Sequence, residues 1–136
     1  MSMGLADGIR NARLNVIRDG IDAGGSAGTL DIYSAPRPSK GAATTDQVLL
    51  ATVTFDYPCA PDAGAGELVF SVMSSGVGLG TAEATWARIR ASGGAFVADA
   101  SVGAMGSSAE VILSDTAIVT GAPVEVQSGK LTEGNA

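Results

Sequence analysis

Few side chains in this 136-residue chain have the chemistry that catalysis needs. The sequence contains no histidine and a single cysteine, Cys59. Without histidine, neither a Ser-His-Asp nor a Cys-His nucleophile can form, and histidine-based zinc sites are excluded as well. One cysteine can form neither an intramolecular disulfide nor a cysteine-only metal site. We expect Cys59, which follows Pro58, to pack in a loop or at a sheet edge rather than to act as a nucleophile.

The acidic residues and the glycines show no spacing that is typical of an active site. Glycoside hydrolysis uses a pair of carboxylates, but the acids here are scattered along the chain. Asp31, Asp56 and Asp62 do not belong to a calcium-binding loop of regularly spaced acids. The glycine-rich stretch 76–80 lacks the Lys-Ser or Lys-Thr ending of a phosphate-binding loop, so it predicts a turn. We predict a non-enzymatic protein without catalytic residues, cofactor or metal.

The chain is acidic, with a formal net charge of −6. This charge argues against binding to the phosphate backbone of nucleic acids, which requires clustered Lys and Arg, and aromatic side chains for base stacking are few. Residues 41–87 contain no Lys or Arg. They form either a solvated surface or a patch that is complementary to a basic partner. Their acidic residues are Asp46, Asp56, Asp62, Glu67 and Glu83.

The sequence also gives expectations about the cellular compartment in which the protein is made. It has no apolar run of about 18 residues, so we expect no membrane span. Its first residues lack the basic start and apolar block of a secretory signal. A single cysteine fits synthesis in a reducing cytoplasm.

Residues 5–22 are the best candidate for a helix, because their apolar residues recur at helical spacing. Asp7 is placed to cap the start and Gly20 to end it. Two apolar stripes lie on opposite sides of this helix. Either residues 1–24 are an arm that contacts both its own domain and a neighbouring subunit, or a shorter helix from about residue 9 to 19 packs on its own sheet. One stripe is Leu5, Ile9, Ala12 and Val16, and the other is Leu14, Ile17 and Ile21.

From residue 28 onward, short runs rich in Val, Ala and Thr alternate with turns rich in Gly and Pro. Regular spacing of this kind is typical of an all-β sandwich. We predict an antiparallel β-sandwich of the jelly-roll type over residues 28–133, preceded by the short N-terminal helix or arm and followed by a tail at 134–136. The expected strands are 29–34, 48–55, 67–73, 81–91, 95–102, 110–113, 117–119 and 124–131, with turns at 74–81 and 92–94.

Large side chains are scarce, so the core depends on a few of them. The expected anchors of the core are Trp86, Phe55, Phe70 and Phe96. The apolar alternation changes phase after Trp86, which predicts a β-bulge near residues 86–87.

Four basic residues are candidates for a contact surface. Arg37 and Lys40 lie in a loop at 35–47 that is rich in Pro, Ser and Gly, which predicts an exposed basic tip. Arg88 and Arg90 share one face of a strand. That face is either solvated or forms an exposed basic stripe that meets an acidic partner.

Several segments together resemble a known group of virion proteins. In order they read ARLNVIRDGIDAGG, SAGTLDIYSAPRP, TTDQVLLATVTF and TAEATWARIRASGGAFVADASVG, followed by TEGN. With these segments in this order, nearly the whole chain resembles the jelly-roll cement, or decoration, proteins of tailed bacteriophage capsids.

The resemblance implies a structural protein of the virion that binds the outside of the major capsid shell and stabilises it. The implied partners are a major capsid protein with the HK97-type fold and a second copy of the chain in a homodimer, with no nucleic acid and no membrane. Phage tail and fibre components share the same style of sequence, so a receptor-binding role on the tail is the alternative. The residues expected at contact surfaces are Leu14, Ile17, Ile21, Arg37, Lys40, Arg88 and Arg90.

Overall fold

The protein is built mostly from short strands, with one α-helix near its start. The computed structural model describes residues 4–132, apart from the side chain of Lys40. The expected tail at 134–136 therefore lies outside the described residues. This secondary-structure content, mostly strands with one helix, agrees with the predicted all-β class. In chain order the elements are α1 (Asp7–Ile21), β1 (Thr29–Tyr33), the 3-10 turn η1 (Ser39–Gly41), β2 (Leu49–Thr54), β3 (Glu67–Val69), β4 (Gly76–Val77), β5 (Ala82–Glu83), β6 (Trp86–Arg90), β7 (Phe96–Ala104), β8 (Val111–Leu113), β9 (Ala117–Ile118), β10 (Pro123–Val124) and β11 (Val126–Thr132).

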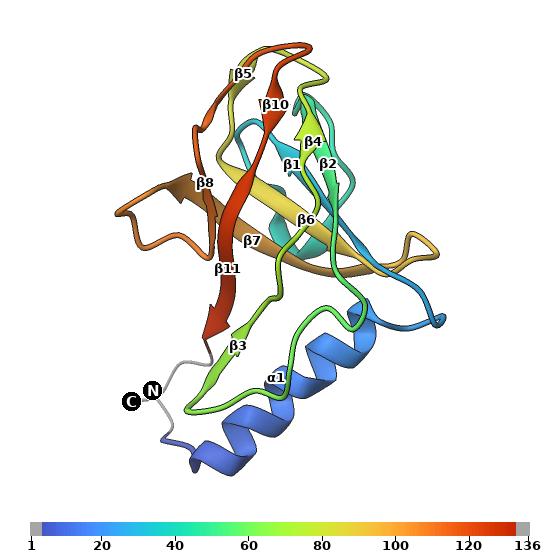
Figure 1. Ribbon diagram of the computed structural model, residues 1–136, viewed down its shortest axis with the longest axis vertical. Helices are drawn as coiled ribbons and strands as arrows, with labels where there is room; N and C mark the ends of the chain where they lie inside the picture. Colours follow the sequence, from blue (N-terminus) through green and yellow to red (C-terminus); the bar gives the residue numbers. More distant parts are fainter. Residues whose placement is uncertain (1–3, 133–136) are drawn as a thin grey trace.

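A seven-stranded sheet in the order β2-β1-β6-β7-β8-β11-β3 forms the body, and two small ribbons, β10-β4 and β5-β9, lie at one end (Figure 1). The sheet is mixed, because β7 and β8 run parallel with Val102 opposite Val111. The prediction of a purely antiparallel arrangement is therefore wrong. Parallel neighbours usually need a long crossover, but here the loop 105–110 returns the chain beside the end of β7. The side chains of Ser101 and Glu110 brace this loop by bonding each other's backbone N–H groups.

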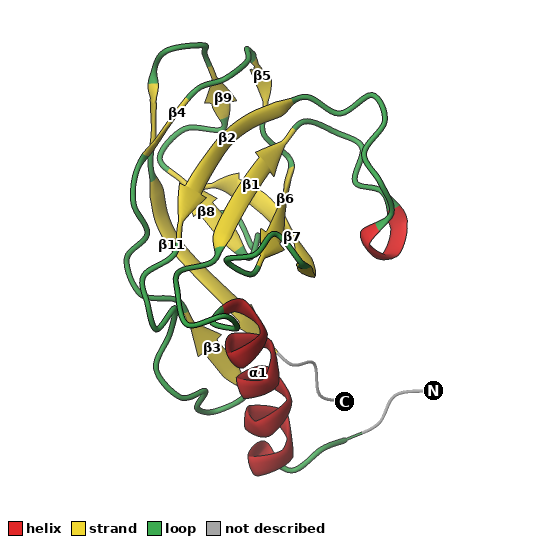
Figure 2. Ribbon diagram, turned by 90° about the vertical axis from the view of Figure 1, so that its right-hand side faces the viewer, coloured by secondary structure: helices red, strands yellow, loops and turns green. Residues whose placement is uncertain are grey.

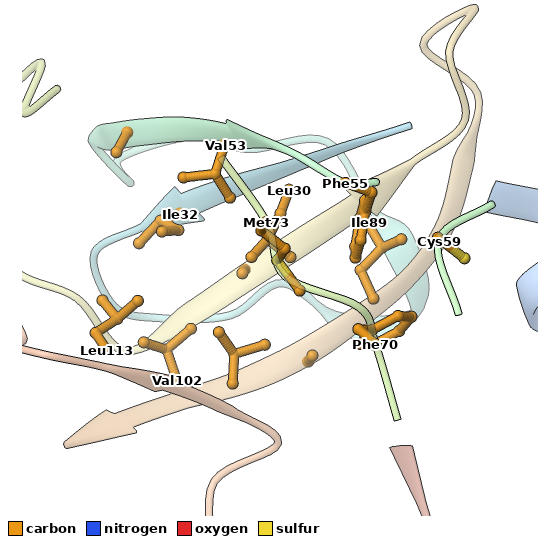
Figure 3. Close-up of a cluster of buried hydrophobic side chains, with 14 of the residues drawn as sticks. Leu30, Ile32, Val53, Phe55, Cys59, Phe70, Met73, Ile89, Val102 and Leu113 are labelled. Atoms are coloured by element: carbon orange, nitrogen blue, oxygen red, sulfur yellow. The ribbon is translucent and has the colours of Figure 1, made fainter. Parts of the chain in front are cut away.

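Residues 67–79 join the two edges of the sheet, so that the sheet curls around the core. At the start of this segment, β3 pairs with β11. The chain then crosses to the opposite edge, where the Ser74 N–H donates to the Thr54 carbonyl at 3.0 Å and the Leu79 N–H donates to the Leu50 carbonyl at 2.8 Å. The buried side chains inside the curl include Leu50 and Leu68. Figure 3 shows others of this core, among them Leu30, Ile32, Val53, Phe55, Phe70, Ile89, Val102 and Leu113.

The stretch 74–81, predicted as a turn, contains β4, so that prediction is corrected. Its glycines allow close approach between backbones. A Cβ on Gly76 would lie 2.9 Å from the Thr52 carbonyl oxygen, and one on Gly78 would lie 2.1 Å from that of Val119. Both distances are shorter than side-chain carbons tolerate, so these positions are restricted to glycine.

Helix α1 packs against the body beside β3 (Figure 2). The stripe that faces the body is the one with Leu14 and Ile21, which are 2% and 0% exposed, and the partly buried Ile17 also packs on the core. The prediction that Leu14 and Ile21 lie at a contact surface is wrong, because both are core side chains of their own chain. Ile9 and Val16, on the other stripe, are exposed. No helix within residues 4–132 is long and apolar enough to cross a membrane.

Polar side chains also fix α1 to the body. They lie on one side of the helix and bind loop 59–66, which explains why a helix with two apolar stripes uses only one of them internally. The predicted cap does not form: Ala6 precedes the helix, and Asp7 lies in the first turn. The helix ends at Ile21, one residue beyond the predicted Gly20. Asn11 accepts from the Gly66 N–H, Asn15 from the Ala63 N–H and Asp22 from the Cys59 N–H, and Arg18 pairs with Asp62.

The predicted bulge near residues 86–87 is not formed, because β1 and β6 pair in continuous register there. The change of phase has another origin: the predicted strand 81–91 is two strands, β5 and β6, with a break between them. The irregularity lies instead between Ile89 and Arg90, in the pairing of β6 with β7. A one-residue slip moves side chains to the opposite face. Phe96 consequently lies outside the core and is 45% exposed, so its prediction as a core anchor is wrong.

Leu14→Ala tests whether α1 is part of the core. We expect it to lower the free energy of unfolding by about 2–5 kcal/mol, because it removes buried methyl groups and leaves a cavity. Val16→Ala, on the exposed side of the same helix, should change that free energy by no more than about 0.5 kcal/mol. Urea unfolding followed by circular dichroism measures both values. Equal effects would contradict the packing described for α1.

Candidate functional site

The outer face of β1, β6 and β7 carries a second cluster of buried side chains, separate from the main core. Tyr33 and Trp86 are directly opposite each other on neighbouring strands, and their rings stack with centroids 4.7 Å apart. The indole N–H of Trp86 donates to the Ser34 carbonyl at 2.7 Å. Trp86 is 2% exposed, which confirms that it is buried, although it faces away from the main core.

Arg88 lies at the centre of this cluster. Its guanidinium carbon is 5.3 Å from the centroid of the Trp86 ring and 5.2 Å from that of Phe96, which are cation–π distances. The guanidinium donates to both carboxylate oxygens of Asp99, at 2.9 and 3.2 Å, and to the Ala42 carbonyl at 2.9 Å. The hydrogen bonds to Asp99 raise the pKa of Arg88 above its ordinary value. Arg88 is only 4% exposed.

The exposed basic stripe predicted for Arg88 and Arg90 is therefore not formed. Arg88 is buried by its partners, and the Arg90 side chain, which is 29% exposed, pairs with an acid of its own. The Arg90 guanidinium donates to Asp31 at 3.0 Å and to the Gly94 carbonyl at 3.1 Å. Both arginines hold the sheet together and neither offers an unpaired charge to a partner.

Residues 34–48, here called the 34–48 loop, cover this cluster. At the base of the loop, the Ser34 N–H donates to the Val48 carbonyl, and the Val48 N–H donates to the Ser34 hydroxyl. Further out, Gly41 has a positive φ of 73°, and a Cβ there would lie 2.6 Å from the Phe96 ring. The loop thus rests on Phe96 and is tied to Arg88 through the Ala42 carbonyl.

A hollow of about 380 Å³ opens where the 34–48 loop meets β7. Arg37 is exposed at its rim. Among the basic side chains that the structure describes, Arg37 alone makes no ion pair or hydrogen bond, which agrees with the predicted basic tip. Lys40 lies in η1, and its side chain is outside the described residues. The hollow is lined by Arg37, Pro38, Ser39, Phe96 and Asp99.

The chemistry of this arrangement is suited to binding a ligand. Arg37 can pair with a carboxylate, and the exposed part of Phe96 can cover an apolar group. Sequence reasoning missed Phe96 and Asp99 as members of the site. A signal for Asp99 existed, because a hairpin turning at 92–94 places it opposite Arg88. The other predicted contact residues, Leu14, Ile17 and Ile21, lie on α1 and do not join this site.

Cys59 is buried in the loop after β2, as predicted for a packing residue. Its N–H donates to the Asp22 carboxylate at 3.0 Å. Burial, together with the nearby Asp22 charge, raises the pKa of the thiol to about 12, so it stays protonated at neutral pH. Within residues 4–132, no group of three or more Cys, Asp and Glu side chains is placed to hold a metal ion.

The chain was compared with known protein families, with curated proteins and with solved structures, and none of them matches.

Arg88→Ala should lower the free energy of unfolding by about 3–5 kcal/mol, because it leaves the Asp99 carboxylate buried without its partner. Arg90→Ala breaks a more exposed pair and should cost about 1 kcal/mol or less. Replacing both Arg88 and Asp99 by Ala should cost less than the sum of the two single changes. Guanidinium unfolding of the four variants measures these differences. A larger loss for Arg90→Ala than for Arg88→Ala would contradict the role given to Arg88.

The Cys59 thiol should make stability depend on alkaline pH. Because its pKa is 9.0 ordinarily and about 12 in the fold, the stability that it contributes is complete below about pH 9 and is lost as the pH rises toward 12. The free energy of unfolding should fall by at most about 1.4 kcal/mol for each pH unit in this range. Cys59→Ala should show a shallower decline in the same titration. Fast labelling of the native thiol at pH 8 would overturn this prediction.

Proposed function

We propose that this chain is a non-enzymatic structural protein of a phage virion, a capsid cement or decoration protein that binds the outside of the major capsid shell. The resemblance of nearly the whole sequence to such proteins supports this function. The observation that carries it is the 34–48 loop, which presents the unpaired cation Arg37 on a base fixed by buried Arg88.

A loop that is held in place before binding loses little conformational entropy when a partner docks. Arg37 at its rim would speed the encounter with an acidic surface and fix the register of docking. In this proposal the acidic surface belongs to a major capsid protein with the HK97-type fold. A protein that binds only the assembled shell stabilises that shell by mass action and needs no active site.

The same proposal includes three finer points. The fold is a jelly-roll-like sandwich, a reading that the curled sheet and the ribbons at its end support. The chain acts as a homodimer on the capsid surface. It is made in the bacterial cytoplasm and works on the virion, without contact with nucleic acid or membrane.

The alternative is a tail or fibre component that binds a receptor on the host cell. One observation favours it. The hollow beside the 34–48 loop combines the exposed ring of Phe96 with the polar side chains of Ser39 and Asp99. A partly exposed aromatic ring next to hydroxyl-binding groups suits a sugar.

Counting the copies of the chain in purified particles separates the two functions. A capsid decoration protein is present in a fixed, high number of copies, and its removal leaves particles less resistant to heat. A tail protein is present in only a few copies, and its removal impairs adsorption to the host. A few copies per particle would overturn the capsid proposal.

The role of the 34–48 loop can be tested with particles from which the whole chain is missing. The purified chain is added back to these particles and its rebinding is measured. We expect Arg37→Glu to weaken rebinding at low salt by about tenfold, because it reverses a charge at the edge of the contact. Lys130→Glu is the matched control: this lysine is also exposed and lies on β11, away from the loop. Equal loss for both variants would show that general charge, and not the loop, determines binding.

A further inference from the structure

Helix α1 is joined to the rest of the chain by one short segment, residues 23–27, here called the hinge. Most of the hinge is exposed. Within the described part of the chain, its one hydrogen bond to the body runs from the Ser92 hydroxyl to the Ala23 carbonyl, at 3.2 Å. The chain turns back at Gly24 and Gly25, whose φ angles are 93° and 77°. Because glycine adopts negative φ as readily as positive φ, these positions do not oppose an open hinge.

The contacts that dock α1 are made with segments far from the hinge in the sequence. Asn11 and Asn15 each accept from a backbone N–H of loop 59–66 at 2.8 Å. Leu14 and Ile21 pack into the core, and the helix contacts β3 and β7. The same helix from a second copy of the chain would meet these partners in the same geometry. It would therefore make the same hydrogen bonds and the same apolar contacts.

An undocked α1 is not a stable state of this protein. Leu14 and Ile21 are almost completely buried, and undocking would expose both of them and the core that they cover. The hinge can thus stay open only when α1 docks on another copy. The docking contacts are identical in the closed monomer and in such an exchanged dimer. The hinge, and any new contact that only the dimer makes, therefore set the balance between the two forms.

The outer side of α1 supplies an apolar surface for a new contact. Ile9, Ala12 and Val16 lie on this side and are here called the outer stripe. Ile9 is 53% exposed and Val16 is 70% exposed, so neither contributes much to the fold of its own chain. Figure 2 shows α1 at one end of the molecule. An open hinge of this length spans at most about 20 Å, which keeps two exchanged helices close to both bodies.

We propose that two copies of this chain form a dimer by exchanging α1 across the hinge, with the outer stripes of the two helices packed at the twofold axis. This inference rests on the homodimer of the proposed function and states how its two copies are joined. The exchange uses no residue of the 34–48 loop. It also gives both apolar stripes of α1 a role, the inner one on the partner's body and the outer one between the copies.

Cross-linking between chains tests the exchange. In a Cys59→Ala background, one full-length chain carries Asn15→Cys and another carries Ala63→Cys. The two chains are mixed, unfolded in urea, refolded together and oxidised. Because the Asn15 side chain lies 2.8 Å from the Ala63 N–H nitrogen, the two thiols come within disulfide range. We expect a disulfide between the chains on a non-reducing gel. Val16→Cys in place of Asn15→Cys is the matched control and should form no such bond, since residue 16 faces away from loop 59–66.

Changes in hinge length should shift the balance in opposite directions. Deletion of Gly24 and Gly25 leaves too few residues for the turn back onto the same body, so dimers should predominate. Insertion of Gly-Ser-Gly-Ser after Gly25 gives the closed form more room and should favour monomers. Size-exclusion chromatography with light scattering measures the mass of each variant.

The contribution of the outer stripe is tested separately. The double change Ile9→Ser and Val16→Ser should raise the dissociation constant of the dimer by about tenfold or more, because these side chains are buried only between the copies. Val72→Ser is the matched control. Val72 is 88% exposed and lies outside α1, so this change should leave the dissociation constant as it is.

A chain that stays monomeric at every concentration tested would overturn the proposal. So would a dimer that shows no disulfide between Asn15→Cys and Ala63→Cys, or an insertion variant that dimerises as well as the unchanged chain. If the deletion variant fails to fold, the insertion variant and the disulfide decide the question. A monomeric chain that binds capsid shells would contradict this inference and leave the capsid function intact. Exchanged dimers that do not bind shells would do the reverse.

Discussion

Strand β6 is buried on both faces, and this arrangement determines where most other elements lie. Ala87 and Ile89 point into the main core, whereas Trp86 and Arg88 point the other way. A charged side chain can be buried only when its hydrogen bonds are satisfied. The outer face therefore requires Asp99 from β7 and the backbone of the 34–48 loop. A segment that reads as an ordinary surface loop is thus tied to the sheet through the Ala42 carbonyl, and it places Arg37 at the rim of the hollow.

Much of the fold is predictable from the sequence, because period-two alternation reports which side of a strand is buried. β1 and β2 fall within one residue of their predicted bounds for this reason. The prediction fails where a non-periodic contact decides the outcome. A slip in strand pairing turns Phe96 outward, and the loop 105–110 makes a parallel pair where antiparallel pairing was expected. Both apolar stripes of α1 are visible in the sequence, but polar contacts with loop 59–66 select the inner one.

The candidate site is predictable only in part. Arg37 is expected to be exposed because it lies between prolines, and the structure places it at the rim of the hollow. The burial of Arg88 cannot be inferred from its own strand, since it depends on Asp99 in the next strand and on Ala42 in the loop. The exposure of Val77 and Leu79 also escapes prediction from apolar alternation, because their alternation with glycines resembles a turn in the sequence.

The pairing of β3 with β11 has a consequence for how the protein is made. Glu67 pairs with Thr132, and Thr29 in β1 pairs with Arg90, so the sheet is assembled from partners that are far apart in the sequence. Contacts of this range slow folding, because long loops must close before they form. During synthesis β3 leaves the ribosome well before β11 exists. Until then the apolar interior of the curl stays open, and the negative charge of residues 41–87 opposes aggregation of the growing chain.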